Sequence, residues 1–406
     1  MAHLEQIITH LTDNDLYKVS MGQMFLHQYP DAIVEWTYKN RNSKTLFTQE
    51  MIDEINYQID LYCNLRFTQE ELDFIKKLKY IKQDYVDYLV LWHPQRSQIT
   101  CVLDKEKQQP EIHFHGPNVQ VSWYEVPVMA IVAEVYFRMK YTKEEQEAAM
   151  EEAKKRLHEK IDRLARGELK LGAFSEFGTR RRFCKEFQEY AIKEFAKWQF
   201  NGTKFVGTSN VYFAMKYALV PCGTMAHEAI ELVGQGYPFH NPAYSNYYMM
   251  KSWVKEYGVQ NGIYLTDCIT TDCFLKDFDI RFATLFSGLR HDSGDPVEWG
   301  EKMLMVYQQL GIDTRNKTLL FSDSLDFDKA AMLYQRFSGR CKVAFGVGTF
   351  IVSDNGLPIM NQVIKLTEVN GIPVVKISDT AGKSMGKSEE YKAYLQRCID
   401  WRVKND

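Results

Sequence analysis

From about residue 168 to about residue 350, short apolar segments alternate with longer stretches of helical character, and a small or polar cluster directly follows each apolar segment. This alternation is typical of parallel βα units, arranged as a sheet or as a barrel. In such folds the loops after the carboxyl ends of the strands hold the active site. The strands are expected to contain residues 173–174, 205–206, 218–220, 263–265, 285–286, 319–321 and 343–345.

The two ends of the chain do not show this βα alternation. Before the middle part, we expect a strand at 32–38, a helix at 67–78, strands over 97–123 that turn at 115–118, and a charged amphipathic helix over 142–166. After it, we expect strands at 363–366 and 374–377, followed by a helix from Glu389.

The composition argues against several other classes of protein. The chain of 406 residues has 50 Lys and Arg against 53 Asp and Glu, and this formal net charge of −3 argues against nucleic-acid binding. The N-terminus lacks the basic start and apolar core of a signal peptide, and no apolar run reaches the roughly 20 residues needed to span a bilayer. The eight cysteines are scattered, which is typical of reduced thiols. We therefore expect a cytoplasmic protein.

Three of the clusters after the expected strands suit a phosphorylated ligand. The segments GVGT at 346–349 and SDS at 322–324 offer backbone N–H and hydroxyl donors to a phosphate. The alternatives are a tight turn for the first and a helix cap for the second. In RHDSGDP at 290–296, Arg290 suits phosphate oxygens, and the carboxylates suit ribose hydroxyls or Mg²⁺. The alternative there is an acid-rich N-cap.

Two further clusters carry groups that suit an aromatic anion or a transferred phosphoryl group. FGTRRR at 177–182 places three cations beside Phe177, which could stack a flat ring; the alternative is a helix that opens with solvated arginines. His227, in GTMAHE at 223–228, could act as an acid or base or accept a phosphoryl group, or it could be an ordinary histidine. AGKSMGKS at 381–388 resembles a P-loop, but Ala381 replaces its first glycine, so we interpret it as a basic loop.

Several motifs, taken in their order along the chain, are similar to those of one enzyme family. They are TDNDLYK (12–18), EFGTRRR (176–182), GTSN (207–210), GTMAHE (223–228), RHDSGD (290–295), FSDSL (321–325) and FGVGT (345–349). Together they resemble the nicotinate phosphoribosyltransferase family, a group within the type II phosphoribosyltransferases. The resemblance implies an irregular β/α barrel domain over 126–354 and a second α/β domain built from 1–125 and 355–406. It also implies a homodimer with shared active sites.

The resemblance implies an ATP-dependent reaction of the ligase class in NAD salvage. The 5-phosphoribosyl group of phosphoribosyl pyrophosphate would pass to nicotinate, giving nicotinate mononucleotide and pyrophosphate. His227 would be phosphorylated transiently by ATP, and Mg²⁺ would be the metal, with no residue assigned as its direct ligand. The reaction needs no strong general base, because the pyridine nitrogen has a free lone pair. Strand-end loops that are rich in Arg, Asp and Gly agree with such a reaction.

The resemblance also implies roles for single residues. Tyr17 of one subunit would sandwich the pyridine ring against Phe177, and Arg180 would face its carboxylate. Those expected at the phosphoribosyl end are Arg290 and Asp292 at the ribose phosphate, Gly348 and Thr349 at the 5′-phosphate, and Asp267 and Asp323 at the ribose or the Mg²⁺-pyrophosphate.

One position bears on the choice of base. Relatives that use nicotinamide carry Asp where this chain has Ser209, and an Asp would repel a carboxylate, so Ser209 favours nicotinate. The alternatives are a phosphoribosyltransferase that uses nicotinamide or quinolinate, and a barrel protein that binds a phosphorylated ligand without chemistry.

Overall fold

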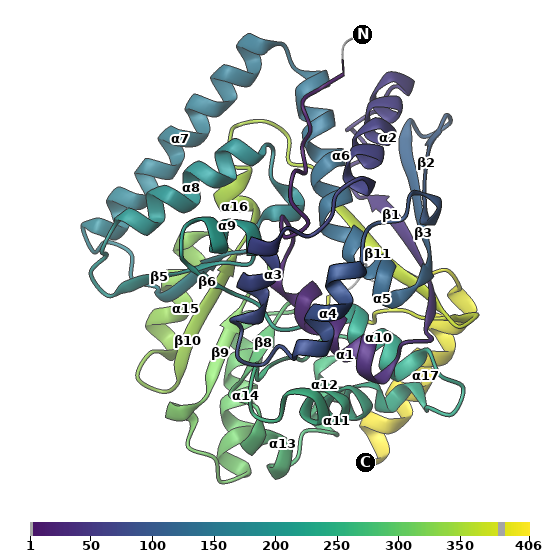
Figure 1. The fold of residues 1–406 in the computed structure, drawn as a ribbon. Helices are drawn as coiled ribbons and strands as arrows, with labels where there is room; N and C mark the ends of the chain where they lie inside the picture. The colour runs from purple at the N-terminus through teal and green to yellow at the C-terminus, as the bar shows by residue number, and fades with distance from the viewer. Residues whose placement is uncertain (1–2, 381–385) are drawn as a thin grey trace.

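The computed structural model describes residues 3–380 and 386–406, and its strands form two separate sheets (Figure 1). The first is antiparallel, in the order β12-β11-β1-β3-β2, and lies on the right of the view. It combines strands from both ends of the chain. Their bounds are β1 Ile33–Asn40, β2 Ile99–Asp104, β3 Gln109–Pro117, β11 Gln362–Val369 and β12 Ile372–Pro373.

The second sheet is parallel and curled, and it occupies the lower left of Figure 1. Its order is β6-β5-β4-β10-β9-β8-β7, and no pairing in the described residues joins β6 to β7, so the barrel is open. The bounds are β4 Gly172–Glu176, β5 Thr203–Thr208, β6 Val220–Pro221, β7 Ile263–Leu265, β8 Gly288–His291, β9 Thr318–Phe321 and β10 Lys342–Val347. The predicted fold class, an irregular β/α barrel with a second α/β domain from both chain ends, is confirmed.

Helices surround both sheets. In the first part of the chain they are α1 Leu16–Gln28, α2 Gln49–Cys63, α3 Gln69–Lys76, α4 Gln83–Leu91, α5 Asn118–Val121, α6 Glu125–Lys140 and α7 Lys143–Ala165. In the barrel they are α8 Lys185–Lys197, α9 Val211–Lys216, α10 His227–Gln235, α11 Ser245–Tyr257, α12 Thr271–Leu275, α13 Ile280–Leu285, α14 Pro296–Gln309, α15 Phe327–Phe337 and α16 Thr349–Val352. The last is α17 Glu389–Asn405.

The predicted amphipathic helix over 142–166 is α7, and its sequence explains both its start and its orientation. The Thr142 side chain accepts a hydrogen bond from the Glu145 backbone, and the Glu145 side chain accepts one from the Thr142 backbone in return. This capping box satisfies two N–H groups that a helix start would otherwise leave unpaired. The helix buries Ala149, Ala153, Leu157, Ile161 and Leu164, which recur every three or four residues on one face.

The strand expected at 285–286 is wrong. Leu285 is the last residue of α13, and the Phe286 backbone N–H still donates to the Phe282 carbonyl oxygen. The strand at this point is β8, which begins at Gly288. A Cβ atom at Gly288 would lie 2.2 Å from the Thr318 carbonyl oxygen, so this start permits the close approach of β9. The apolar pair therefore closes a short capped helix rather than filling a strand.

Two further expectations at the chain ends are wrong in position. The turn expected at 115–118 lies instead between β2 and β3, where the Asp104 carboxylate accepts hydrogen bonds from the backbone of Glu106 and Lys107. The region 374–377 is not a regular strand, and only Ile377 pairs, as an isolated bridge to Ile269. In both places the apolar alternation is real, but local hydrogen bonds and packing set where the pairing ends.

The join of the two chain ends is made by β1, which pairs with β3 on one side and β11 on the other. The domain limits at 125/126 and 354/355 stay a prediction. All eight cysteines are free thiols, as expected. No helix in the described part of the chain is long and apolar enough to cross a bilayer.

Candidate active site

A cavity of about 620 Å³ lies at the carboxyl ends of the parallel strands. It is closed from the other side by residues of the antiparallel sheet, among them Val363 and Lys365 of β11. Ten of the eleven residues predicted to form the site line it: Tyr17, Phe177, Arg180, Ser209, His227, Arg290, Asp292, Asp323, Gly348 and Thr349. The eleventh, Asp267, is buried directly behind His227.

Tyr17 and Phe177 line this cavity from one and the same chain. The segment before Tyr17 binds to the barrel, because Asp15 forms a bridge with Asn210 and the Leu16 N–H donates to the Ser209 carbonyl oxygen over 2.8 Å. This chain therefore brings its own Tyr17 to the cavity, and the sharing of tyrosines between two subunits stays a prediction. A single chain provides both aromatic rings.

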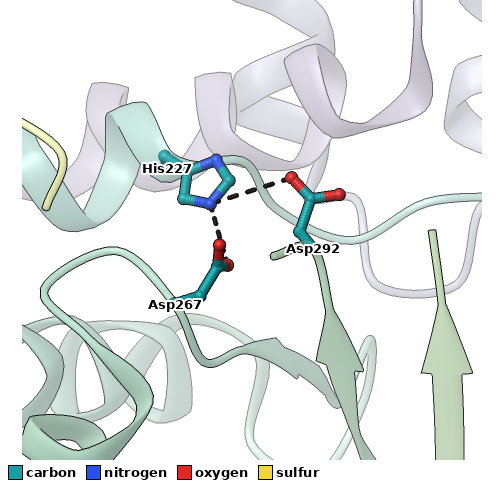
Figure 2. A group of neighbouring side chains, drawn as sticks. All are labelled: His227, Asp267 and Asp292. Atoms are coloured by element: carbon teal, nitrogen blue, oxygen red, sulfur yellow. Dashed lines mark hydrogen bonds and ion pairs between the residues drawn. The ribbon is translucent and has the colours of Figure 1, made fainter. Parts of the chain in front are cut away.

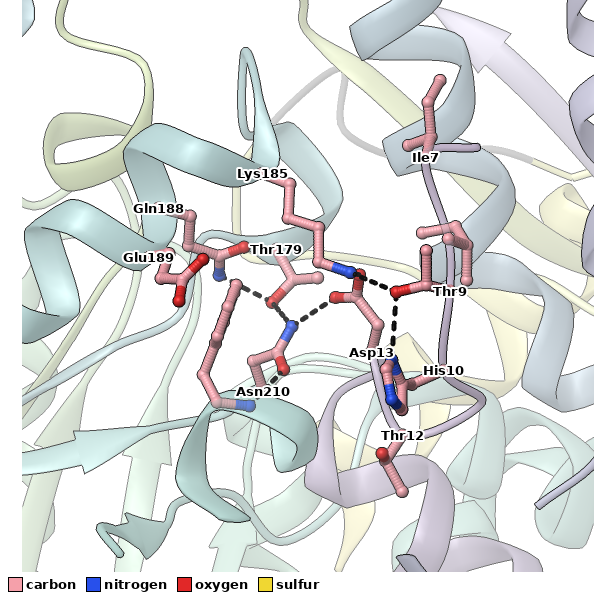
Figure 3. Close-up of polar contacts among 12 residues, drawn as sticks. Ile7, Thr9, His10, Thr12, Asp13, Thr179, Lys185, Gln188, Glu189 and Asn210 are labelled. Carbon is pink, nitrogen blue, oxygen red and sulfur yellow. Dashed lines mark hydrogen bonds and ion pairs between the residues drawn. The ribbon is translucent and has the colours of Figure 1, made fainter. Parts of the chain in front are cut away.

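Buried ion pairs hold the N-terminal segment in this position. The Arg182 guanidinium donates to both oxygens of Asp13, over 2.7 and 3.0 Å, and to Glu134 over 2.8 Å. Asp13 also forms an ion pair with Lys185 over 3.2 Å and accepts a hydrogen bond from Asn210 Nδ2 over 2.7 Å (Figure 3). Burial would raise the pKa of Asp13, but Arg182 and Lys185 hold it below its ordinary value. Arg182, expected with its neighbours to bind an anionic ligand, is fully buried and has a structural role instead.

The GVGT segment makes room for Phe177. A Cβ atom at Gly346 would lie 2.4 Å from the Phe177 ring, and one at Gly348 would lie 2.8 Å from the Phe177 carbonyl oxygen. The Phe177 N–H donates to the Val347 carbonyl oxygen over 2.9 Å, which ties the two loops together. These glycines are therefore needed for a close approach of two loops, a role that their sequence pattern alone does not distinguish from phosphate binding.

His227 is the first residue of α10 and lies between two carboxylates (Figure 2). Its Nε2 atom is 3.0 Å from Asp267 Oδ1 and 3.9 Å from Asp292 Oδ2. Asp267 Oδ2 accepts from Lys376 Nζ over 2.7 Å. Burial, with the nearby Lys376 charge, lowers the pKa of His227 to about 4. The imidazole is therefore neutral at pH 7.

Asp267 stays ionised in this cluster. Burial alone would raise the pKa of Asp267, but Lys376 and His227 hold it well below its ordinary value. Burial would likewise lower the pKa of Lys376, and Asp267 and Asp292 reverse this effect. The Asp267–Lys376 ion pair therefore holds the His227 ring through its Nε2 atom and leaves the Nδ1 atom without a contact to the pair. Among the described residues, none forms a hydrogen bond with His227 Nδ1.

Two of the predicted motifs meet at Arg290. Its Nε atom donates to Ser322 Oγ over 2.8 Å, and its Nη2 atom donates to Asp292 Oδ1 over 3.1 Å. Burial would raise the pKa of Asp292, but Arg290 holds it below its ordinary value. The alternative of an acid-rich N-cap applies to Asp295 only, which accepts from the backbone of Val297 and Glu298 at the start of α14.

Sequence reasoning missed two acidic residues near Tyr17: Asp15 lines the cavity, and Glu125 lies beside Tyr17 and Arg180. Asp15 accepts a hydrogen bond from Ser209 Oγ over 2.7 Å, and burial raises the pKa of Asp15. Glu125 Oε1 lies 3.8 Å from Arg180 Nη1, and its Oε2 atom accepts from Lys18 Nζ over 2.7 Å. Asp15 could have been suspected because it lies two residues before Tyr17.

Three other cavity residues gave no signal in the sequence, namely Arg41, Lys365 and Lys376. Arg181, which also lines the cavity, was indicated only as one of the three cations of FGTRRR. The lysines lie in the C-terminal segment, whose apolar alternation indicates strands but not which barrel loops they would face. The cavity thus combines arginines, lysines and carboxylates at the strand ends of a β/α barrel, as in an enzyme that handles anionic, phosphorylated small molecules.

Comparisons with known proteins give the family. The model of the nicotinate phosphoribosyltransferase (NAPRTase) family matches residues 173–401, and the model of the NAPRTase N-terminal domain matches residues 12–133. The chain therefore belongs to the nicotinate phosphoribosyltransferase family. The motifs quoted above predicted this membership, and it is confirmed.

Individual relatives agree over nearly the whole length. A nicotinate phosphoribosyltransferase of Ectopseudomonas mendocina is 44% identical over 97% of this chain and 96% of its own. One of Ralstonia nicotianae is 42% identical over 96% and 98%. The crystal structure of a nicotinate phosphoribosyltransferase from Vibrio cholerae is similar with a TM-score of 0.89, at 33% identity, over 98% of this chain and 95% of that one. The structure of one from Porphyromonas gingivalis has a TM-score of 0.87 and 31% identity, over 98% of this chain and 100% of that one.

Proposed function

We propose that this chain transfers the 5-phosphoribosyl group of phosphoribosyl pyrophosphate to nicotinate, releasing nicotinate mononucleotide and pyrophosphate, with ATP hydrolysis coupled through His227. The observation that carries the proposal is the single cavity that joins an aromatic pair, Tyr17 and Phe177, to the Arg290–Asp292 pair and to the neutral His227. Family membership supports the same reaction.

Nicotinate would bind at the end of the cavity near Tyr17. Its flat ring suits the space between the two aromatic side chains, and its carboxylate suits Arg180, which lines the same cavity. Ser209 is a neutral hydroxyl that already donates to Asp15. A further carboxylate at position 209 would bring two acids together beside a carboxylate substrate, so Ser209 favours nicotinate over its amide.

Phosphoribosyl pyrophosphate would occupy the remaining length of the cavity. Gly348 and Thr349 would receive its 5′-phosphate, and Arg290 with Asp292 would hold the ribose phosphate end. In the reaction the bond from C1′ to the pyrophosphate oxygen breaks, and the lone pair of the pyridine nitrogen forms the new bond to C1′. Positive charge develops on the ribose as in glycoside cleavage, and carboxylates near the ribose stabilise it.

The donor set fits a magnesium ion between protein and substrate. The Asp292 Oδ2 atom has no hydrogen bond in the described part of the chain, and Asp323 lines the same cavity. Mg²⁺ is bound by one or two carboxylates together with substrate phosphates. When bound, it would neutralise charge on the pyrophosphate. His227, Asp267 and Asp292 are also grouped closely enough for a cation, but Lys376 already neutralises Asp267.

His227 fits the role of phosphoryl acceptor. Its Nε2 atom is held by Asp267, so the Nδ1 atom is left to attack the γ-phosphorus of ATP, and ADP departs. Because the pKa of His227 is about 4, the ring has its lone pair free at neutral pH. Asp267 would then stabilise the positive charge that the ring gains when it is phosphorylated.

Assembly and cellular location belong to the proposal as well. We propose a homodimer in the cytoplasm, in which each site uses the Tyr17 of its own chain. The dimer would then stabilise the subunits without contributing the aromatic pair.

A direct test combines the purified chain with phosphoribosyl pyrophosphate, Mg²⁺ and nicotinate, with or without ATP, and measures pyrophosphate and nicotinate mononucleotide. We expect both products and a faster rate with ATP. Parallel reactions with nicotinamide and quinolinate identify the base. An equal or greater kcat/KM for either would contradict the choice of nicotinate. Absence of pyrophosphate release with every base would favour a barrel protein that only binds a phosphorylated ligand.

A further inference from the structure

We propose that Arg181 contacts phosphate oxygens of phosphoribosyl pyrophosphate, and that the adjacent Arg180 and Arg181 thereby divide the cavity between nicotinate and the phosphoribosyl donor. The inference rests on the proposed function and assigns a substrate-contacting role to a residue that no motif singled out by itself. Both arginines belong to one short turn, η3 Thr179–Arg181, and both line the cavity.

The surroundings of Arg180 place it near the nicotinate end. Its Nη1 atom lies 3.8 Å from Glu125 Oε1, and this carboxylate helps to raise the pKa of Arg180 against the effect of burial. The Tyr17 hydroxyl lies 3.5 Å from the same carboxylate, and Tyr17 lines the cavity with Arg180. Arg180 therefore has a carboxylate neighbour within the protein and faces the residues of the aromatic slot. The carboxylate of nicotinate would then be a second carboxylate partner of the Arg180 guanidinium.

Arg181 lies among different groups. Burial, together with the charges of Arg180 and Arg41, lowers its pKa to about 10, which still leaves it a cation at neutral pH. The acidic groups that oppose this lowering of its pKa are Asp292 and Asp323, which both line the cavity at its expected phosphoribosyl end. Within residues 3–380 and 386–406, no carboxylate forms an ion pair with Arg181.

The Arg181 side chain also has a buried donor that lacks a partner. Its Nε atom is inaccessible to solvent and forms no hydrogen bond with any described residue. A buried donor without a partner costs about 1–3 kcal/mol, and more when it is charged. Such a group is retained where a ligand completes it. A guanidinium presents a rigid fork that matches two oxygens of a phosphate, which makes a phosphate the fitting partner.

The backbone of Arg181 is fixed on both sides, so the side chain is pre-positioned. Its N–H donates to the Gly178 carbonyl oxygen over 2.8 Å, and its carbonyl oxygen accepts from Ser353 Oγ over 2.8 Å. Ser353 follows α16, the helix that begins at Thr349. The hydrogen bond thus links Arg181 to the loop expected at the 5′-phosphate and not to the Ser209 end of the cavity.

The third arginine of the run shows that an unpaired arginine is not a general feature of this segment. Arg182 donates from all three of its nitrogens to Asp13, Glu134 and Gln188. The three consecutive arginines therefore differ in their partners. Arg180 lies near the Glu125 carboxylate, Arg181 has no carboxylate partner among the described residues, and Arg182 is paired with the buried Asp13 and Glu134. Only the middle one needs a ligand to neutralise it.

The test compares Arg181→Gln, Arg181→Lys and Arg180→Gln by steady-state kinetics. For R181Q we expect the KM for phosphoribosyl pyrophosphate to rise about tenfold or more, corresponding to about 1.4 kcal/mol, with the KM for nicotinate within about twofold of wild type. R181K keeps the charge without the fork and should recover part of the loss. R180Q should show the opposite split, with the larger change in the KM for nicotinate.

Direct binding separates this inference from the proposed function. Titration calorimetry with phosphoribosyl pyrophosphate, inorganic pyrophosphate, ribose 5-phosphate and ATP needs no turnover. Weaker binding of phosphoribosyl pyrophosphate by R181Q supports the inference, and whichever fragment also weakens identifies the phosphate in contact. Wild-type affinity of both R181Q and R181K for phosphoribosyl pyrophosphate, or a loss confined to ATP, would overturn it. If the wild type binds the donor but makes no nucleotide, the proposed function fails while Arg181 is still tested.

Discussion

Two clusters of buried charge lie beside the cavity, and they differ in how completely their groups are paired. In the Asp13–Arg182 cluster, every nitrogen of the guanidinium donates to a protein oxygen. In the His227–Asp267 cluster, Lys376 satisfies the carboxylate from behind, but His227 Nδ1 has no hydrogen bond within the described chain. The first cluster is complete without a ligand and fixes the fold. The second is incomplete without a ligand, and its His227 lines the cavity.

The two clusters show that a buried charge in this molecule can be interpreted by whether other protein groups pair it completely. Burying a charge costs several kcal/mol unless it is paired, so a saturated cluster gains nothing from a ligand. An unsaturated cluster that borders a cavity can be completed by one. By this criterion we expect His227 and Arg181 to contact a ligand, and we expect Arg182 to stabilise the fold.

The largest expected effect comes from breaking the saturated cluster. Arg182→Ala leaves Asp13 and Glu134 buried without their cation and should lower the free energy of unfolding by about 3–5 kcal/mol. Denaturant unfolding measures this change. Arg315→Ala is the matched control, because its pair with Asp313 is on the surface and should contribute little to stability. Equal effects of the two variants would contradict the structural role of Arg182.

The corresponding change in the unsaturated cluster should affect coupling rather than stability. His227→Asn removes the proposed phosphoryl acceptor, and we expect ATP stimulation to disappear while some ATP-independent synthesis remains. Nicotinate mononucleotide formation with and without ATP measures this. Full stimulation of the variant by ATP would rule out a phosphohistidine at this position.

The N-terminal segment held by the saturated cluster gives a third test, by mixing two defective variants. Tyr17→Ala lacks one wall of the proposed nicotinate slot, and Arg290→Ala lacks the proposed contact with the ribose phosphate. Because each cavity takes both residues from one chain, a mixture refolded or exchanged together should regain no activity above that of the separate variants. Restored activity would mean that subunits share their tyrosines. Co-purification of differently tagged variants serves as the control for subunit exchange.

The smallest expected effect concerns pH. The pKa of His227 is about 4 in the folded protein against 6.5 ordinarily, so the unfolded chain takes up a proton here first as pH falls. This group's contribution to stability is therefore full above about pH 6.5 and is lost on acidification toward pH 4, by at most about 1.4 kcal/mol per pH unit. His227→Asn should flatten the pH dependence of unfolding in this window, and an unchanged slope would contradict the neutral buried histidine.

The same shift predicts the pH profile of coupling. The ratio of the rates with and without ATP should hold from pH 7.5 down to about pH 5.5, where an ordinary histidine would be mostly protonated. A ratio that falls with a midpoint near 6.5 would contradict this. Lys376→Met removes a charge that lowers the pKa of His227, so it should move the fall of the ratio to higher pH.

Much of this fold could be predicted because the signals are local. The alternation of apolar and helical segments placed the strands from β4 to β10 apart from two errors, at 285–286 and at 218–220, of which only Val220 lies in β6. The amphipathic pattern placed the start of α7, whose N-cap is Thr142. The error at 285–286 arose because two apolar residues fit the end of a helix as well as a strand. The resemblance of the motifs to one family indicated ten cavity residues. Those that follow strands of the parallel sheet meet because the carboxyl ends of its strands lie at one edge.

What the sequence determined by itself is therefore the family, the βα alternation and the identity of the strand-end loops, since each depends on residues that are neighbours along the chain. Only contacts across the tertiary structure place Tyr17 in its own chain's cavity, bring in Lys365 from β11 and Lys376 from the segment after β12, and bury Arg182 while Arg181 is not paired. These outcomes depend on contacts between segments more than a hundred residues apart, such as Asp13 with Arg182. No local pattern encodes which carboxylate such an arginine will meet, because packing of the whole domain brings the two together.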